Sequence, residues 1–202
     1  MTAQTPELAI RAQGLTKNFG SLSAVANLDM ELRVGEALAM VGPDGPGKTT
    51  TMRLLCGIMD PDSGPAEVLG HDTVRAPKAL KAHIGYMPQR FGLYDDLTVA
   101  ENISFYADLY QVPKLELQLR MPGMLDFSNL GPFQSRLAAN LSGGMRQKLG
   151  LICALIHTPR LLFLDEPTFG VDPFSRRECW EIRYRLLGEG LTIFPSFHCL
   201  YG

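Results

Sequence analysis

The segment from Gly42 to Thr50, GPDGPGKTT, has the residue types and spacing of a loop that binds phosphate groups. Its glycines allow tight turns that aim backbone N–H groups at phosphate oxygens. Lys48 supplies a positive charge to the terminal phosphates of a nucleotide, and the Thr49 hydroxyl can ligate Mg²⁺. An apolar run at 37–41 precedes the segment and a helical pattern follows it, so the positive end of the helix dipole would face the same anion. This context disfavours the alternative, a chance glycine-rich turn.

A second candidate is the pair of acids that closes the apolar run Leu161–Glu166, LLFLDE. Asp165 is suited to hold Mg²⁺ through water, and Glu166 is suited to polarise an attacking water. Acids at the end of a strand often do no more than cap a following helix. The phosphate loop upstream favours the catalytic interpretation.

The third candidate is the segment Leu141–Met145, LSGGM, which is followed by Arg146 and Gln147. A serine and two glycines at the start of a helix leave N–H groups exposed, so this helix start predicts a second anion site. In isolation the same residues would be an ordinary serine N-cap with a flexible entry.

With these three segments in this order, the chain resembles the nucleotide-binding domain of the ATP-binding cassette (ABC) transporter family over nearly its whole length. The resemblance implies that ATP and Mg²⁺ are the cofactors and that ATP hydrolysis drives transport. It also implies a homodimer or paired cassette domain arranged head to tail. Each ATP would then lie between the phosphate loop of one copy and the LSGG segment of the other.

The resemblance assigns nucleotide-binding positions in the phosphate loop and in the signature segment LSGG. Those in the loop are Gly42, Asp44, Gly45, Gly47, Lys48, Thr49 and Thr50, and those in the signature are Ser142, Gly143 and Gly144.

Further single residues are assigned in the same way. Thr49, Gln89 and Asp165 would contact the metal, directly or through water. Glu166 matches the catalytic base. The remaining catalytic positions are Gln89, which would also sense the membrane partner, and the switch histidine His198.

Two other nucleotide contacts follow from the resemblance. Asp172, in GVDP, matches the loop that couples the two sites across the dimer. Phe19, within KNFG, occupies the place of the aromatic residue that stacks on adenine; the alternative is a core phenylalanine at a strand end.

The stretch IGYMPQRFGLYDDLTVAENISFYADLY resembles exporters of the drug and antibiotic branch. It implies a separate membrane subunit of about six spans, each of about 20 apolar residues. Residues 89–96 would contact that subunit, although Phe91, Leu93 and Tyr94 fit a subdomain core equally well. This sequence has no apolar run of spanning length, so we expect a peripheral place on the cytoplasmic face of the membrane, through the partner.

The elements that must position these residues alternate between strand and helix, which indicates an α/β sheet with ligands at the carboxyl ends of its strands. Strands are expected at 9–17, 28–32, 37–41, 66–69, 83–87, 161–164 and 191–194. Helices are expected at 48–56, 98–110, 143–156 and 175–188, with 114–140 helical but interrupted at Pro122 and Gly131. Thr98 and Glu101 have the spacing of a capping box.

The helices near 90–155 interrupt the alternation and predict an inserted subdomain. The resemblance makes the fold class a P-loop NTPase (RecA-like) core with a small antiparallel β subdomain and an inserted α-helical subdomain. We expect one domain over 1–202, with 1–88 and 156–202 as the core and 89–155 as the helical signature subdomain.

Composition and cysteine spacing limit the possible partners and sites but do not identify a reaction. The net charge of −2 gives no electrostatic reason to expect nucleic acid as a partner. The cysteines lie far apart, without a metal-ligand or disulfide pattern, and are expected to be reduced packing residues: Cys56, Cys153, Cys179 and Cys199.

Three departures from the family pattern bear on activity. Pro46 has no N–H to offer a phosphate, which would weaken ATP binding about tenfold or more. Pro195 would delete a ladder bond in the last strand and distort the approach to His198, next to Phe197 where a small hydroxyl residue is usual. The chain ends at Gly202, where the family continues, so we expect an open side of the sheet and marginal stability.

Two alternatives stay open beside a transport ATPase, the first because of these departures and the second because such proteins share the same motifs. One is a truncated, degenerate cassette that holds nucleotide weakly with little turnover. The other is a soluble cassette ATPase acting on ribosomes or DNA, which the charge of −2 disfavours. A P-loop kinase is more distant, and LSGGM argues against it.

Overall fold

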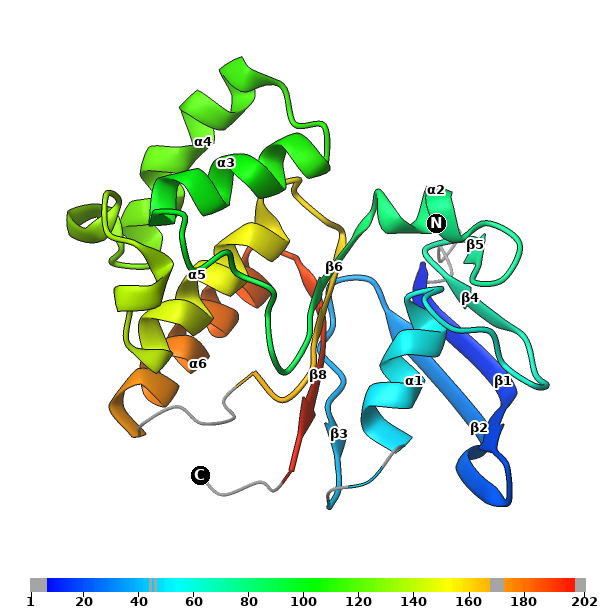
Figure 1. Cartoon of the computed structure of the whole chain (residues 1–202). Helices are drawn as coiled ribbons and strands as arrows, with labels where there is room; N and C mark the ends of the chain where they lie inside the picture. Colours follow the sequence, from blue (N-terminus) through cyan, green and yellow to red (C-terminus); the bar gives the residue numbers. More distant parts are fainter. Residues whose placement is uncertain (1–6, 44, 46, 168–172, 199–202) are drawn as a thin grey trace.

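The structure is a computed structural model, and it describes residues 7–43, 45, 47–167 and 173–198. An antiparallel sheet lies on the right of Figure 1. Its strand order is β2-β1-β4-β5, from β1 (Leu8–Phe19), β2 (Leu22–Arg33), β4 (Ala66–Val68) and β5 (His71–Asp72). β1 and β2 are longer than the sequence predicted, because together they form one hairpin that turns sharply after Phe19.

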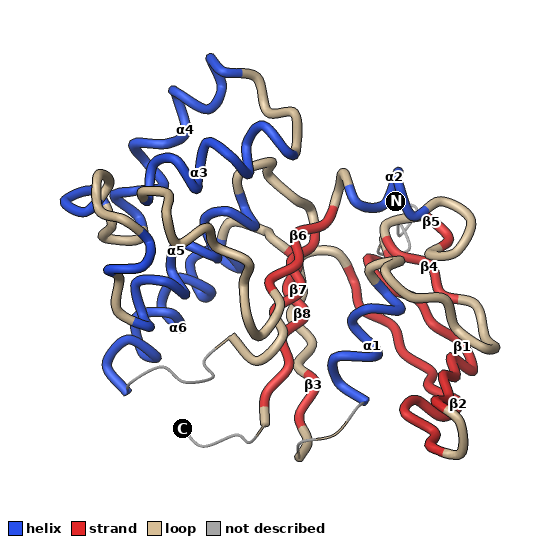
Figure 2. Tube along the Cα trace, viewed as in Figure 1, coloured by secondary structure: helices blue, strands red, loops and turns tan. Residues whose placement is uncertain are grey.

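A parallel sheet occupies the middle of the molecule, as Figure 2 shows. Its strand order is β3-β8-β7-β6, from β3 (Met40–Val41), β6 (Ile84–Met87), β7 (Leu161–Leu164) and β8 (Thr192–Phe197). All three pairings within it are parallel. The expected α/β class, with a small antiparallel subdomain, is confirmed.

β7 shows how this sheet is buried on both faces. Leu161 and Phe163 belong to a core shared with helix α1 (Gly47–Leu55) and the antiparallel sheet. Leu162 and Leu164 belong to a core shared with helices α5 (Gly143–Leu155) and α6 (Pro173–Gly188). Successive side chains of a strand point to opposite faces, so a continuous apolar run is what a strand covered on both sides requires.

The expected helical insertion is also present, on the left of Figure 1. Helix α3 (Val99–Leu109) starts with the predicted capping box between Thr98 and Glu101. It packs on α5 and α4 (Lys114–Phe127) around a core of its own. A short helix α2 (Pro77–Lys81) lies before β6, and two 3₁₀ turns lie at Gly131–Phe133 and Ala138–Asn140. The division of the chain at 88/89 and 155/156 stays a prediction.

Helix α4 corrects the predicted break at Pro122. The helix continues through Pro122 and Gly123 and stops at Phe127, whereas the break before Gly131 is confirmed. Proline removes the hydrogen bond to the carbonyl four residues earlier, which here belongs to Gln118. Pro122 and Gln118 are both exposed, so water can satisfy that carbonyl and the helix tolerates the proline.

Strand β3 corrects a second expectation. The run 37–41 was predicted to be a buried parallel strand; the strand is parallel but covers only Met40–Val41. It lies at the edge of its sheet, and Leu38 and Val41 are 37% and 43% exposed. Among the described residues, β3 has a strand neighbour on one side only.

The predicted distortion at Pro195 is not seen. Pro195 pairs with Leu164 of β7, and the next residues of β8 pair with Met40 and Val41 of β3. The whole of β8 is buried. The strand therefore reaches the residue before His198 without a break.

Two of the predicted packing cysteines, Cys56 and Cys153, are free and buried. Burial raises the pKa of both thiols, which makes them poor nucleophiles. The Cys179 side chain and Cys199 lie outside the described residues. None of the helices in the described ranges has the length and hydropathy needed to span a bilayer.

Candidate nucleotide site

Four of the predicted site residues lie at the carboxyl ends of the strands of the parallel sheet. Gly42, Asp165 and His198 directly follow β3, β7 and β8. Gln89 follows β6 with one residue between them. Parallel strands end on the same side of a sheet, so residues far apart in sequence converge there. Each of these four residues follows a different strand, and the parallel sheet brings them to the same side of the molecule.

Lys48 is held by oxygen atoms rather than by solvent. Its Nζ donates to the carbonyl oxygens of Gly42 at 2.8 Å and Pro43 at 2.7 Å. It also pairs with Glu166 Oε1 at 3.2 Å, and the Lys48 residue is only 7% exposed. This arrangement agrees with the predicted contact of Lys48 with phosphate, because a phosphate oxygen can replace the carboxylate at the ammonium.

Glu166 forms the centre of the constellation. Its Oε2 accepts a hydrogen bond from Gln89 Nε2 at 3.1 Å, while Oε1 faces Lys48. Its backbone has φ of 46°, in the left-handed region that costs a residue other than glycine about 1–3 kcal/mol. Such strain persists where surrounding contacts impose it, and here it accompanies a carboxylate bridging two predicted site residues.

Asp165 is 1% exposed and is held on every side. Its N–H donates to the Met87 carbonyl at 2.8 Å, and its Oδ1 accepts from Ser196 Oγ at 2.9 Å. Tyr86 Oη lies 3.5 Å from Oδ2, and burial is the main cause that raises the Tyr86 pKa to about 12. Sequence reasoning missed Ser196 and Tyr86. The available signal was that both lie at or near the carboxyl ends of predicted strands, 83–87 and 191–194.

The phosphate loop has open space in front of its glycines. A side-chain carbon added at Gly42 or Gly45 would meet no atom within 4 Å, whereas one at Gly47 would lie 3.0 Å from the Ala24 carbonyl. Thr49, at the start of α1, is half-buried, and Thr50 is buried. Asp44 and Pro46 lie outside the described residues. Open space therefore lies beside the backbone at Gly42 and Gly45, whereas Gly47 packs closely against β2.

Phe19 ends β1, and its side chain is 45% exposed. The alternative of a core phenylalanine does not describe this position. β2, its hairpin partner, contacts the start of α1 through Ala24 and Gly47. The exposed ring of Phe19 therefore lies on a hairpin that contacts the helix following the phosphate loop.

The signature segment lies in the helical part, across the parallel sheet from α1 in Figure 1. Ser142 is the N-cap of α5, and its Oγ accepts from the Met145 N–H at 3.3 Å. Ser142 and Gly143 are exposed, whereas Gly144 is buried. The N-cap is therefore confirmed and the helix start is exposed, whereas the anion site at this segment stays a prediction.

The other predicted residues are placed as follows. His198 is exposed directly after β8, and Asp172 lies outside the described residues. Phe91 and Leu93 pack against the core of the helical part, whereas Tyr94 is 44% exposed. Within residues 89–96, the core interpretation therefore fits the first two side chains and the surface interpretation fits Tyr94.

The chemistry of the donor set fits Mg²⁺. Thr49, Gln89 and Asp165 offer hydroxyl, amide and carboxylate oxygens, which are the ligand types this ion prefers. In the described part of the chain, no group of three or more His, Cys, Asp or Glu side chains could hold a metal alone.

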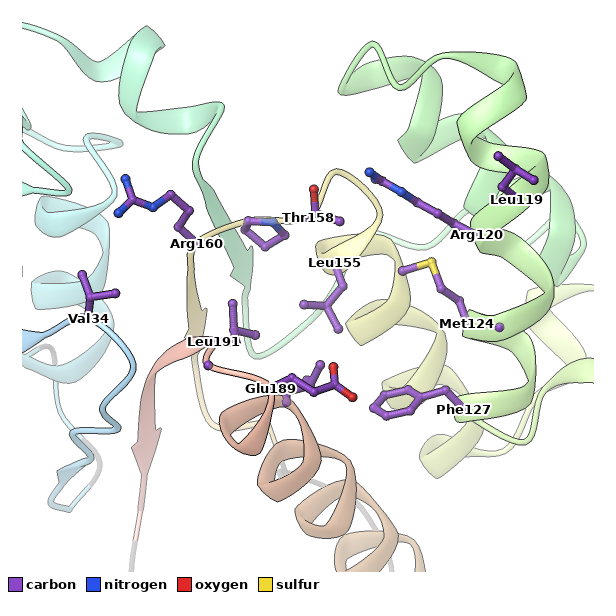
Figure 3. Close-up of a pocket in the computed structure, with 14 residues that line it drawn as sticks. Val34, Leu119, Arg120, Met124, Phe127, Leu155, Thr158, Arg160, Glu189 and Leu191 are labelled. Carbon is purple, nitrogen blue, oxygen red and sulfur yellow. The ribbon is translucent and has the colours of Figure 1, made fainter.

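A separate pocket of about 680 Å³ lies at the opposite, amino-terminal ends of β7 and β8, shown in Figure 3. Met124 and Phe127 of α4 line one side, and Leu155, Arg160 and Leu191 line others. None of the predicted site residues lines it. The pocket is therefore distinct from the candidate nucleotide site.

Comparison with known proteins agrees with this geometry. The sequence profile described as ABC transporter matches residues 25–169. A solved structure described as the ATP binding subunit of an ABC transporter superposes with a TM-score of 0.83 at 28% identity, covering 95% of this chain and 80% of that one.

Two curated relatives share the sequence over most of this chain. The probable multidrug ABC transporter ATP-binding protein YbhF of Escherichia coli (strain K12) is 51% identical over 94% of this chain. The daunorubicin/doxorubicin resistance ATP-binding protein DrrA of Streptomyces peucetius is 36% identical over 93%. The chain spans 33% of the length of the first relative and 57% of the second. Its core is a P-loop NTPase fold, and the chain belongs to the ABC transporter family.

Proposed function

We propose that the chain binds ATP with Mg²⁺ at the phosphate loop and hydrolyses it as the ATP-binding subunit of an exporter. One observation carries the proposal: the Glu166 carboxylate bridges Lys48 at 3.2 Å and Gln89 at 3.1 Å, beside the buried Asp165. An ammonium, an amide and two carboxylates at one sheet edge are the groups that phosphoryl transfer to water requires.

Lys48 and Glu166 have different roles: the first binds phosphate and the second activates water. When the terminal phosphate arrives, the Lys48 ammonium exchanges the Glu166 carboxylate for phosphate oxygens. This releases Glu166 to accept a hydrogen bond from a water molecule and to polarise it for attack on the phosphorus. Gln89, already in contact with Glu166, would orient the same water, and the exposed His198 would contact the γ-phosphate.

Mg²⁺, when bound, would neutralise phosphate charge and stabilise charge that develops in the transition state. Asp165, Thr49 and Gln89 would hold it. A cation is needed because the constellation brings two carboxylates and only one ammonium to an anionic ligand. The burial of Asp165 gives its carboxylate a constant position for this task.

The second half of the site comes from another molecule or a paired domain. Ser142 and Gly143 are exposed at the start of α5, in the helical part rather than beside the phosphate loop. Head-to-tail pairing of two cassettes would bring the N–H groups at this helix start to the nucleotide bound on the partner. Asp172 would couple the two sites, and Phe19 would stack on adenine.

Export is supported by the names of the relatives, which refer to multidrug transport and to daunorubicin and doxorubicin resistance. The partner is a membrane subunit of about six spans of about 20 apolar residues each. The chain would sit against its cytoplasmic face, with the exposed Tyr94 as one contact. The net charge of −2 gives nucleic acid no attraction.

The test is ATP hydrolysis by the purified chain with and without Mg²⁺, followed by sedimentation of Glu166→Gln with and without ATP. We expect Mg²⁺-dependent release of phosphate and ATP-dependent dimers of the variant. A chain that neither hydrolyses ATP nor dimerises in its presence would refute the proposal. Co-purification with ribosomes instead of a membrane subunit would refute the role in export.

A further inference from the structure

Ser196 is a completely buried side chain that contacts both acids of the candidate site. Its Oγ donates to Asp165 Oδ1 at 2.9 Å and accepts the backbone N–H of Glu166 at 3.0 Å. One atom therefore touches the side chain of the first acid and the main chain of the second.

The direction of each hydrogen bond follows from the partners. A backbone N–H can only donate, so the serine oxygen accepts from Glu166. An ionised carboxylate can only accept, so the single hydroxyl proton goes to Asp165. The hydroxyl has no rotational freedom left, and the two acids are held in one relative arrangement.

The topology explains how a residue 31 positions away reaches this point. β8 lies between β3 and β7, and its pairing with β7 ends where Pro195 lies opposite Leu164. Ser196 and Asp165 are the next residues along the chain after the two members of this last pair, so they lie at the same level. Pairing of Ser196 with Met40 on the other side keeps the strand in line.

The contact also accounts for the unusual backbone at Glu166. Its φ of 46° needs a partner that holds the N–H in that direction, and Ser196 Oγ is that partner. With this N–H held, the Glu166 side chain turns toward Lys48 and Gln89. The hydroxyl of Tyr86 is more distant from Asp165, at 3.5 Å, and contacts only its other oxygen.

We propose that Ser196 is a positioning residue for hydrolysis: its hydroxyl holds the Asp165 carboxylate and the Glu166 backbone so that the two acids keep one relative geometry. The inference rests on the proposed function, because it concerns the turnover of ATP. Ser196 itself lies behind the acids and is buried, so it would touch neither nucleotide nor water.

The first experiment compares Ser196→Ala, Ser196→Thr and Thr192→Ala by ATPase kinetics. Thr192 is a matched control, since it is also completely buried on β8 and accepts the Gly35 N–H at 2.9 Å, but pairs with Leu161 at the start of β7. For Ser196→Ala we expect kcat to fall about tenfold, the loss from one hydrogen bond to a charged group, with KM for ATP changed less than about twofold. Ser196→Thr, which keeps the hydroxyl, restores most of kcat, and Thr192→Ala loses thermal stability with kcat unchanged.

The second experiment needs no nucleotide. Hydrogen–deuterium exchange of the Glu166 amide, read from the wild-type chain without ATP or metal, should be slow and should accelerate in Ser196→Ala but not in Thr192→Ala. If Ser196→Ala does not fold, Ser196→Cys replaces it, because a thiol has nearly the same size and is a weaker donor and acceptor.

The outcomes separate the two hypotheses. If the wild-type chain does not hydrolyse ATP, the proposed function fails, and exchange at Glu166 still decides the inference. Equal exchange in the wild type and in Ser196→Ala (or Ser196→Cys) overturns the inference. So does an active wild type whose Ser196→Ala variant keeps kcat, or one in which Thr192→Ala lowers kcat equally.

Discussion

The phosphate loop and the start of α5 are the two regions proposed to bind an anion, and they differ in the partners that they already have. At the phosphate loop, Lys48 has three oxygen partners and Glu166 has two side-chain partners. At the start of α5, Ser142 and Gly143 are exposed, and the serine side chain makes one capping contact. The first region must break its own pairs to admit a ligand, whereas the second can receive a ligand brought by another molecule without internal loss.

The largest effect expected is on turnover in Glu166→Gln. The amide keeps the size of the side chain but cannot polarise water as a base, so hydrolysis should fall about 10²–10⁴-fold. Removing the negative charge also removes the competitor for Lys48, so ATP binding should tighten. Phosphate release and fluorescent-ATP titration measure the two effects. Weaker ATP binding by this variant would show that Glu166 does not compete with phosphate for Lys48.

Lys48→Met tests the same region from the other partner. Loss of a charged hydrogen bond to phosphate should weaken ATP binding roughly 10- to 100-fold. Lys114→Met, an exposed lysine at the start of α4, is the control and should bind ATP like the wild type. Calorimetric titration of both variants decides the matter. Equal affinities would mean that Lys48 serves only its own loop.

The second region is tested by Ser142→Asp against Ser142→Asn. Both side chains cap a helix as well as serine does, so α5 should keep its stability in each. Only aspartate adds a negative charge where a partner's phosphate is expected, and it should lower maximal turnover about tenfold while leaving the ATP affinity of the monomer unchanged. Equal turnover of the two variants would show that this helix start meets no anion.

The smallest effect concerns the contact between the end of α5 and the start of β6, where the helical part meets the parallel sheet. His157 follows α5; its Nε2 contacts the carbonyl oxygen of Ile84 on β6 at 2.9 Å, and its ring stacks on Tyr110 after α3. The carbonyl can only accept, so Nε2 carries the proton, and the buried Nδ1 has no partner. Burial, with a smaller contribution from Arg120, lowers the pKa of His157.

A lowered pKa means that the folded chain resists protonation of His157 more than the unfolded chain does. Its contribution to stability is therefore complete above the unfolded pKa of about 6.5 and is lost as the pH falls through the folded pKa. His157→Phe keeps a ring against Tyr110 but cannot titrate. We expect its Tm to fall less than that of the wild type between pH 7.5 and 5.5, by a few degrees, in scans by circular dichroism. A parallel fall in both chains would contradict this role.

Candidate site residues could be predicted from the sequence more readily than the residues that surround them in the fold. The loop at Lys48 and the segment at Ser142 are short, local patterns, so their residues could be identified without a structure. Ser196 could not be found in this way, because its contacts depend on the register of β8 against β7. The ion pair of Lys48 with Glu166 depends on two segments meeting at one sheet edge.

The errors in the elements have the same origin. The apolar run before Gly42 indicates a strand, but nothing within it says that the strand lies at a sheet edge with Val41 exposed. Pro122 is a helix breaker in general, and only the exposure of α4 explains why the helix tolerates it. Local preference therefore predicted the type of each element, and tertiary position decided its burial and extent.

The contact between Glu166 and Lys48 also determines which anions can enter. Because both groups belong to one chain, the carboxylate is present at the lysine at a constant effective concentration, whatever the composition of the solution. A chloride or acetate ion brings one charge and gains little by displacing a carboxylate that is already in place. A triphosphate brings several charges and further contacts with the loop, so it can win the exchange. We therefore expect the Glu166 carboxylate to keep small anions away from Lys48 and to yield to a triphosphate.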